Sequence, residues 1–192
     1  MNTKSIMIVG VGGQGTLLAS RLLGAALLSE GYDVKVSEVH GMSQRGGSVV
    51  TYVKYGDKVA SPIVQKGQAD LILAFEQLEA ARWLPFLKTD GTIIANTQQI
   101  DPMPVVIGTA EYPAGVLDAV RATGADLTEI DALSLAVKAG SPKAVNVVLI
   151  GVMASHMEIA YDVWENAIRA TVPEKFLELN LKAFEYGYSY SK

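Results

Sequence analysis

Two glycine-framed loops carry the residue types in this chain that could do chemistry. The first is the turn Gly10–Gly15, which has the spacing G-x-G-x-x-G and separates a short apolar run from a helical pattern. Glycines in such a turn let a ligand approach the backbone closely, and the free N–H groups at the start of the following helix favour an anion. The sequence therefore predicts a binding turn, whose candidate residues are Gly10, Gly12, Gly13, Gln14 and Gly15.

The second loop runs from Glu38 to Ser48 and is dense in hydrogen-bonding side chains. Arg45 could hold a carboxylate or phosphate through two hydrogen bonds, and Glu38 or His40 could move or stabilise a proton. Carboxyl ends of parallel strands share one edge of a sheet, so we expect the two loops to lie side by side. We name Glu38, His40 and Arg45 as candidate catalytic residues, with Gly41, Ser43, Gln44 and Gly46 as candidate binding residues. In the alternative interpretation, an ion pair between Arg45 and Glu38 only orders the loop.

Glu38 also allows a different function. It lies 23 residues beyond Gly15, about where a dinucleotide-binding fold places the acid that holds the ribose. Beyond residue 97, however, the chain contains no complete second mononucleotide-binding unit and no residue set for hydride transfer. A free-standing NAD(P)- or flavin-binding oxidoreductase, or a regulatory nucleotide-binding module, stays open as the alternative function.

Other types of site are excluded by composition. The chain has no cysteine, which removes disulfides and cysteine-ligated zinc or iron–sulfur sites, and it has two histidines, which is too few for a site built from several imidazoles. We therefore predict no metal site. His156 is expected to end a helix without chemistry, whereas Asn146, an amide on an apolar helix face, is expected to contact a loop or a partner.

The elements that position these loops alternate between strand and helix. We expect a Rossmann-like α/β fold in which an open, mainly parallel sheet is flanked by helices, within a single domain spanning 1–192. Residues 1–140 would form the sheet core and 141–192 the C-terminal helices. Ser141 and Pro142 predict one helix start, and Thr171 with Glu174 predicts a capping box. The predicted strands are 5–11, 34–39, 48–55, 70–75, 92–96, 105–108 and 126–130, and the predicted helices are 14–28, 77–87, 113–121, 143–156 and two more before the end.

The surface composition indicates a partner. Charged residues are 19% of the chain, apolar types are 49% and the mean hydropathy is +0.25, so apolar surface is expected at an obligate interface. A parallel sheet buried on both faces would explain the same figures. The net charge of −4 and the absence of basic runs argue against nucleic-acid binding. The longest apolar stretch, 147–154, is too short for a membrane span, and we read no signal peptide, so a cytoplasmic location is expected.

With both loops in view, the sequence resembles the gamma-type family of 2-oxoacid:ferredoxin oxidoreductases over essentially its full length. The loop form HGMSQRGG resembles the indolepyruvate branch of that family, whereas pyruvate-type members carry a different, proline- and charge-containing version. The matching segments are GVGGQGTL at 10–17, SEVHGMSQRGGSV at 37–49, DLIL at 70–73, GTIIAN at 91–96, Asn146, and NLKAFEYG at 180–187.

The resemblance implies a subunit role. In that family a 2-oxoacid is decarboxylated oxidatively with coenzyme A, giving an acyl-CoA, carbon dioxide and reduced ferredoxin. Thiamine diphosphate, with its divalent metal, and the [4Fe-4S] clusters would belong to an alpha subunit, ferredoxin would bind through the complex, and this chain would hold no cofactor itself. Its two loops would face the active site. The isolated chain is expected to be inactive and to self-associate, with a homodimer as one outcome. If the subunit is purely structural, Glu38 and Arg45 should tolerate alanine.

Overall fold

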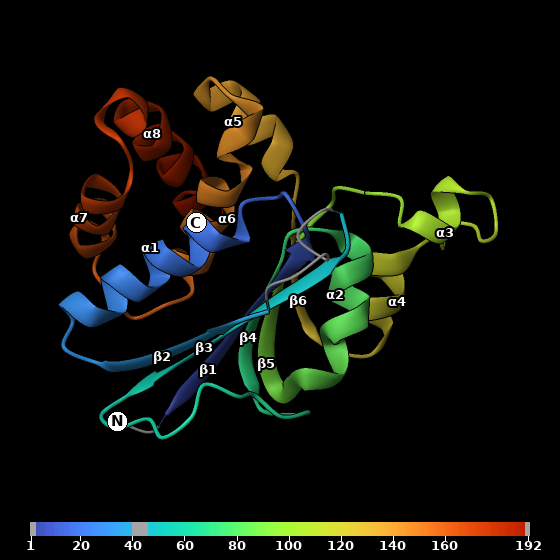
Figure 1. Cartoon of the computed structure of the whole chain (residues 1–192), viewed down its shortest axis with the longest axis horizontal. Coiled ribbons are helices and arrows are strands. Elements are labelled where there is room, and N and C mark those ends of the chain that lie inside the picture. The colour runs from blue at the N-terminus through green and yellow to red at the C-terminus, as the bar shows by residue number, and fades with distance from the viewer. Residues whose placement is uncertain (1–2, 40–45, 191–192) are drawn as a thin grey trace.

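The computed structural model describes residues 3–39 and 46–190. Within these ranges, six strands form one sheet in the spatial order β2-β3-β1-β4-β5-β6 (Figure 1). Helices cover both faces, so the predicted α/β class with an open, mostly parallel sheet is confirmed. The strands are β1 Lys4–Val11, β2 Asp33–Glu38, β3 Ser48–Gly56, β4 Ala69–Ala74, β5 Leu87–Asn96 and β6 Asp126–Ile130.

The strand β3 departs from the parallel arrangement. It pairs antiparallel with both β1 and β2, whereas the pairs β1–β4, β4–β5 and β5–β6 are parallel. In the register of these pairs, Val11 at the end of β1 faces Ser48 at the start of β3, and Glu38 at the end of β2 faces Thr51. The carboxyl ends of β1 and β2 therefore reach the same edge of the sheet, and the connection from β2 to β3 turns back there.

One face of the sheet is covered by a group of helices (Figure 1). They are α1 Thr16–Ser29, α5 Ala132–Ala139, α6 Val145–Ser155, α7 Tyr161–Thr171 and α8 Leu177–Tyr188. The helix α6 is apolar on all sides and is buried from residue 145 to residue 154, as expected for a helix surrounded by other elements. Its side chains share one hydrophobic core with sheet residues such as Ile8 and Leu73. None of the helices in the described ranges is long and apolar enough to cross a membrane.

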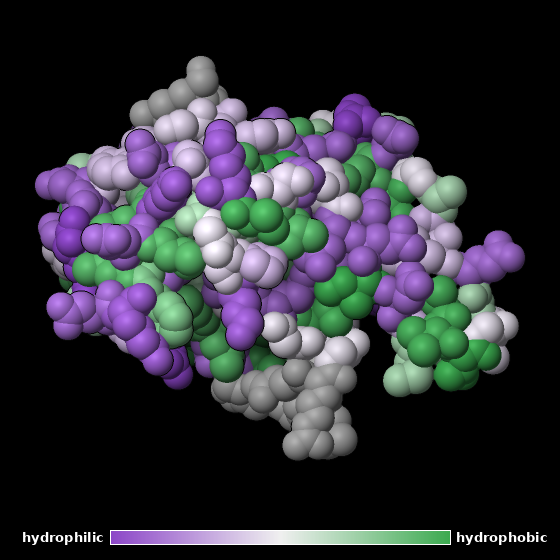
Figure 2. Space-filling view, turned by 90° about the horizontal axis from the view of Figure 1, so that it is seen from above, coloured by the Kyte–Doolittle hydropathy of each residue, from purple (hydrophilic) through white to green (hydrophobic). Residues whose placement is uncertain are grey.

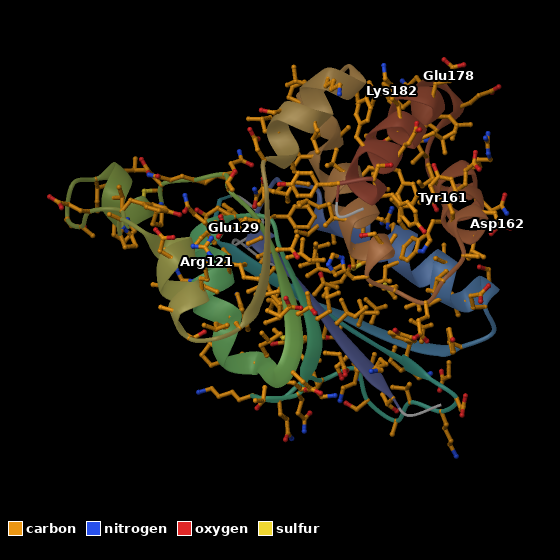
Figure 3. The ribbon with its side chains drawn as sticks, turned by 180° about the vertical axis from the view of Figure 1, so that it is seen from behind. Arg121, Glu129, Tyr161, Asp162, Glu178 and Lys182 are labelled. Atoms are coloured by element: carbon orange, nitrogen blue, oxygen red, sulfur yellow. The ribbon has the colours of Figure 1, made fainter. Side chains whose placement is uncertain are left out.

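The other face is covered by α2 Gln77–Trp83 and α4 Val116–Ala122. A smaller core containing Met7 and Ile72 lies beneath them. Arg121 on α4 forms an ion pair with Glu129 on β6, which ties this helix to the edge strand (Figure 3). The short helix α3, Met103–Val106, stands apart from both layers (Figure 1). The described ranges also contain the 3₁₀ helices η2 Leu84–Phe86, η3 Pro142–Ala144 and η4 Glu174–Phe176.

Two glycines allow α6 and α8 to touch backbone to backbone. A Cβ atom on Gly151 would lie 2.3 Å from the carbonyl oxygen of Phe184, and one on Gly187 would lie 2.0 Å from that of Val148. Real Cβ atoms do not approach backbone this closely, so the crossing requires glycine at both positions. The last helix is thereby held directly against the buried one.

Several predicted elements differ from the structure. The strand predicted at 105–108 is wrong, because Met103–Val106 is helical and projects from the sheet. The helix predicted at 77–87 ends at Trp83, and β5 begins at Leu87 rather than at residue 92. The helix α5 was not predicted at all.

The two predicted helix starts have different outcomes. The Ser141 side chain accepts a hydrogen bond from the Lys143 N–H, as predicted, although it caps η3 rather than the long helix directly. The capping box at Thr171 is wrong, since Thr171 is the last residue of α7 and η4 begins after Pro173 without a side-chain cap.

Candidate functional site

A cleft of about 660 Å³ lies at the edge of the sheet where β1 ends. It is bounded by the first glycine turn, by the start of α6 and by the segment that follows β5. Among the described residues that line it, Lys143 is the charged one. The full lining is Val11, Gly12, Gly13, Gln14, Gly15, Gly46, Gln98, Ile100, Leu133, Pro142, Lys143, Val145 and Asn146.

The glycine turn presents backbone to this cleft. Gly13 has a φ of 101°, and no atom lies within 4 Å of the position that a Cβ would occupy there. Gly15, with a φ of 83°, is the N-cap of α1 and offers no side-chain cap to the first turn of the helix. The first N–H groups of a helix lack partners within it, so this turn is suited to an anionic group.

Gln14 holds the turn together rather than pointing away from the protein. Its Oε1 accepts a hydrogen bond from the Val11 N–H at 2.8 Å, and its Nε2 donates to the Phe75 carbonyl at 2.9 Å. The same Nε2 lies 3.3 Å from Gln98 Oε1. Asn96, fully buried at the end of β5, donates to the same Phe75 carbonyl at 3.1 Å. This amide cluster joins the ends of β1, β4 and β5.

Asn146 links the first turn of α6 to the glycine turn. Its Nδ2 donates to the Gly15 carbonyl at 3.3 Å, and its Oδ1 accepts from the Val147 N–H at 2.9 Å. A Cβ atom on Gly15 would lie 2.6 Å from this Nδ2. The amide expected to contact a loop or a partner thus contacts the first loop, 131 residues away in sequence.

The second loop lies beside the first. The Gly12 N–H donates to the Gly47 carbonyl at 2.9 Å, and Gly46 lines the cleft. The candidate residues His40, Gly41, Ser43, Gln44 and Arg45 lie outside the described residues.

Glu38 is placed at the end of β2, as predicted. Its Oε1 accepts a hydrogen bond from Ser20 Oγ on α1 at 2.6 Å. It also lines a second cavity, of about 280 Å³, together with Gly12, Gly13 and Gly15. Because β3 lies between β1 and β2, two strand spacings, about 10 Å, separate β2 from β1. A dinucleotide-binding fold places these two strands next to each other, so this geometry does not favour the ribose contact.

Two buried acids beside the cleft were not predicted as site residues. Glu76, at the end of β4, accepts hydrogen bonds from the N–H groups of Glu79 at 3.0 Å and Ile100 at 3.2 Å, and from the Tyr112 hydroxyl. Burial, together with this bond to Glu76, raises the pKa of Tyr112. An acid directly after a buried strand, at the carboxyl edge of the sheet, was the sequence signal for Glu76.

Glu79 forms a second group of contacts. Its carboxylate accepts from Ser48 Oγ at the end of the second loop, from Arg82 Nε at 2.9 Å and from Trp83 Nε1 at 3.2 Å. Both acids line a cavity of about 240 Å³ that also contacts Gly46 and Gly47. Glu79 therefore fixes the start of β3, from which the second loop departs.

His156 lies away from the cleft. It caps α6, with Nδ1 2.9 Å from the Val152 carbonyl oxygen, and it lines a separate cavity of about 270 Å³ with Lys4 and Asp70 at the amino ends of β1 and β4. Across the described ranges, no three His, Asp or Glu side chains are grouped so that they could hold a metal ion.

Comparison with known proteins gives consistent matches along the whole chain. The family model described as pyruvate ferredoxin/flavodoxin oxidoreductase matches residues 5–190. Indolepyruvate oxidoreductase subunit IorB from Thermococcus kodakarensis is 42% identical over 199 aligned residues, covering 100% of this chain and 98% of the relative. The protein of the same name from Archaeoglobus fulgidus is 39% identical, covering 96% of this chain and 94% of the relative.

Two further matches are a longer relative and a solved structure. Ketoisovalerate oxidoreductase subunit VorA from Methanothermobacter thermautotrophicus is 30% identical over 97% of this chain, which corresponds to 36% of that longer protein. Among solved structures, the gamma subunit of a keto/oxoacid ferredoxin oxidoreductase from Geobacter sulfurreducens superposes with a TM-score of 0.72 at 26% identity, covering 96% of both chains.

Proposed function

The chain belongs to the pyruvate ferredoxin/flavodoxin oxidoreductase family and is a subunit of a 2-oxoacid oxidoreductase, and on this premise we propose that it serves a complex acting on indolepyruvate. The name shared by these two curated relatives supports this substrate. The proposed reaction cleaves the bond between the carboxyl and keto carbons, releases carbon dioxide and joins the acyl group to the sulfur of coenzyme A. Two electrons pass to ferredoxin, and the thiol proton is released.

We assign the cofactors to a partner subunit. The absence of cysteine excludes iron–sulfur clusters ligated by cysteines of this chain. Residues 3–39 and 46–190 contain no group of three His, Asp or Glu side chains, and we assign no residue of this chain to the divalent cation that would accompany thiamine diphosphate. No step of the reaction is therefore attributed to a cofactor held here. The role of this chain is to cover and complete the site of a thiamine- and cluster-bearing alpha subunit, which would also pass electrons to ferredoxin.

The observation that carries this proposal is the composition of the cleft. It offers backbone groups of the Gly12–Gly15 turn, three side-chain amides and the cation Lys143. Its described lining contains no acid, histidine, serine or threonine that could serve as a nucleophile or general base. Such a surface can position an anionic substrate or coenzyme group and exclude water from reactive intermediates. It can do so beside a catalytic centre supplied by another chain.

We further propose that the second loop contributes positive charge. Arg45 directly precedes Gly46, which lines the cleft. Its guanidinium would bind the carboxylate of the 2-oxoacid or the phosphates of coenzyme A, and Glu38 and His40 would assist with proton movement.

The proposal for Arg45 predicts a selective kinetic effect. Arg45→Ala should raise the KM for indolepyruvate or for coenzyme A by about 10-fold or more in the assembled complex, because a charge-assisted hydrogen bond is lost. Arg169→Ala is a matched control, since Arg169 is exposed on α7 and pairs with Glu165. Unchanged KM values for both substrates in the Arg45 variant would remove this role.

Co-expression with a thiamine-binding alpha subunit tests the subunit function itself. The purified complex should reduce ferredoxin or a viologen dye only when indolepyruvate and coenzyme A are both present, and neither chain should do so alone. If no complex forms and the isolated chain instead binds NAD(P) or a flavin tightly, the free-standing oxidoreductase would replace this proposal. The cavity shared by Glu38 and the glycine turn is where such a ligand would be sought.

A further inference from the structure

A projecting segment beside the cleft has no role in the function described so far. After β5 the chain leaves the sheet, forms α3 at its tip and returns to begin α4 (Figure 1). We call residues 102–110, with the sequence PMPVVIGTA, the α3 knob. In the space-filling view it stands out as a lobe with a hydrophobic surface, separated from the body of the molecule (Figure 2).

The knob is held together by its own hydrogen bonds. The Val105 N–H donates to the Pro102 carbonyl at 2.8 Å, and the Ile107 N–H donates to the Met103 carbonyl at 3.0 Å. The Thr109 N–H closes the turn by donating to the Pro104 carbonyl at 2.9 Å. Together with two prolines, which restrict φ, these bonds give the segment one defined shape.

A buried carboxylate fixes the base of the knob. Glu76 accepts hydrogen bonds from the Ile100 N–H on the outgoing side and from the Tyr112 hydroxyl on the returning side. Its side chain is 1% exposed. Because one acid holds both sides, the knob is presented in a fixed direction from the end of β4.

The surface of the knob is apolar and uncharged. Met103, Val106 and Ile107 are 67%, 66% and 63% exposed, although such side chains are normally buried. Residues 102–110 include no charged side chain, whereas the acids Asp101 and Glu111 flank them at the base. An apolar tip between two acids fits an apolar socket whose rim carries basic side chains.

The length of one relative indicates what supplies the socket. In VorA, the region similar to this chain is 36% of the protein, so that region is covalently joined to further polypeptide. The IorB relatives, by contrast, are covered to 98% and 94% of their length by the match and are named as subunits, so they do not carry such additional polypeptide. We infer that its counterpart here is a separate large subunit. A rigid apolar projection suits binding to such a subunit, since a preformed shape loses little conformational freedom on binding.

We propose that the α3 knob is the anchor by which this chain binds the large subunit of its oxidoreductase complex, seated in an apolar socket with a basic rim. The inference rests on the proposed subunit function. The knob is next to the cleft, because Pro102 and Met103 line the same cavity as Gly46 and Gly47 at the end of the second loop. A subunit seated on the knob would therefore also lie close to Gly46 and Gly47.

The test measures binding and does not depend on catalysis. The double variant V106S/I107S is titrated against the separately purified large subunit of the same organism's oxidoreductase. The Kd should rise by about 30-fold or more, because two apolar anchors are lost. The control is Ile63→Ser, which removes a side chain that is 52% exposed. Ile63 lies in the loop that leads to the start of β4, whereas α3 follows the end of β5, so the two are at opposite edges of the sheet. Both variants should unfold at the wild-type temperature.

A second variant tests the charge of the rim. D101K/E111K should weaken binding at low salt, and the difference from wild type should shrink at high salt as the charges are screened.

The outcomes distinguish failure of the proposed anchor from failure of the proposed subunit function. If wild type binds the large subunit and V106S/I107S binds equally well, the anchor is overturned while the subunit function stands. If the knob variant instead abolishes a homodimer and leaves the large-subunit complex intact, the occupant is a second copy and the anchor is again overturned. If wild type does not bind the large subunit, both proposals fail.

Discussion

Replacing Gly15 with alanine should lower the free energy of unfolding by about 2–5 kcal/mol. The left-handed backbone at this position, with its φ of 83°, costs an alanine about 1–2 kcal/mol. The new methyl group would also lie 2.6 Å from Asn146 Nδ2, so the Asn146 side chain must move. It would then lose its bonds to the Gly15 carbonyl, which keeps its bonds from the α1 backbone, and to the Val147 N–H. Leaving the buried Val147 N–H without this partner costs about 1–3 kcal/mol more.

The variant Gly13→Ala separates the cost of the left-handed backbone from the cost of the collision with Asn146. Gly13 also has a positive φ, of 101°, but has open space where a Cβ would lie, so this variant should lose only about 1–2 kcal/mol. Equilibrium unfolding in urea, followed by tryptophan fluorescence, measures both variants. In the double variant G15A/N146A the collision is removed, so its loss should be smaller than the sum of the two single losses. The reasoning is refuted if Gly15→Ala costs no more than Gly13→Ala, or if the two single losses simply add.

Three further predictions concern the scaffold. Gly151→Ala should destabilise the protein by more than 3 kcal/mol or prevent folding, because its methyl group would overlap the α8 backbone. Gly24→Ala on α1 is the control, because no atom lies within 4 Å of the position of its Cβ. This variant should stabilise the protein by up to about 1 kcal/mol in the same urea assay. Equal effects of Gly151→Ala and Gly24→Ala would contradict the close crossing of α6 and α8. Hydrogen bonds from Ser134 hold the pKa of Asp131 below its usual range. The ionised Asp131 side chain therefore stabilises the folded protein at neutral pH, and this stabilisation is lost as the pH falls. Asp131→Ala should cost about 1 kcal/mol at pH 7 and progressively less towards pH 3, and a constant difference would contradict this. Burial raises the pKa of Tyr55 to about 12, so the unfolded chain loses this proton first and stability should fall between pH 10 and pH 12. Tyr55→Phe should have a weaker pH dependence there, as measured by urea unfolding at pH 9 and pH 11.

The parts of the fold that could be predicted are those with strong local patterns. The buried strand β4 is a nearly continuous apolar run, and the G-x-G-x-x-G turn marks the junction between β1 and α1. Local patterns failed where they were misleading or were overlooked. The segment Val105–Gly108 is β-branched and reads as a strand, but Pro102 and Pro104 begin a helical turn there. The helix α5 has ordinary start and end signals in Asp131 and Gly140, although no helix is predicted there from the sequence.

The candidate site was predictable in its location but not in its internal contacts. Its two loops were identified because glycines and polar residues gather there in sequence. The contacts of Gln14 with Phe75 and Gln98, by contrast, span 61 and 84 residues, and no local pattern specifies them. The same holds for Glu76, whose partners come from a later segment. The antiparallel insertion of β3 between β1 and β2 also depends on pairing between strands, which hydropathy alone does not determine.

The glycine crossing of α6 and α8 has a consequence for the order in which the protein can be completed. The first turn of α6 carries Asn146, which holds Gly15, and α6 in turn rests on α8 near the end of the chain. During synthesis the glycine turn leaves the ribosome long before the helix that supports its partner. Contacts between such distant segments form slowly. A chain that stops before Leu177 would therefore contain every residue that lines the cleft and still lack the support that gives the cleft its shape.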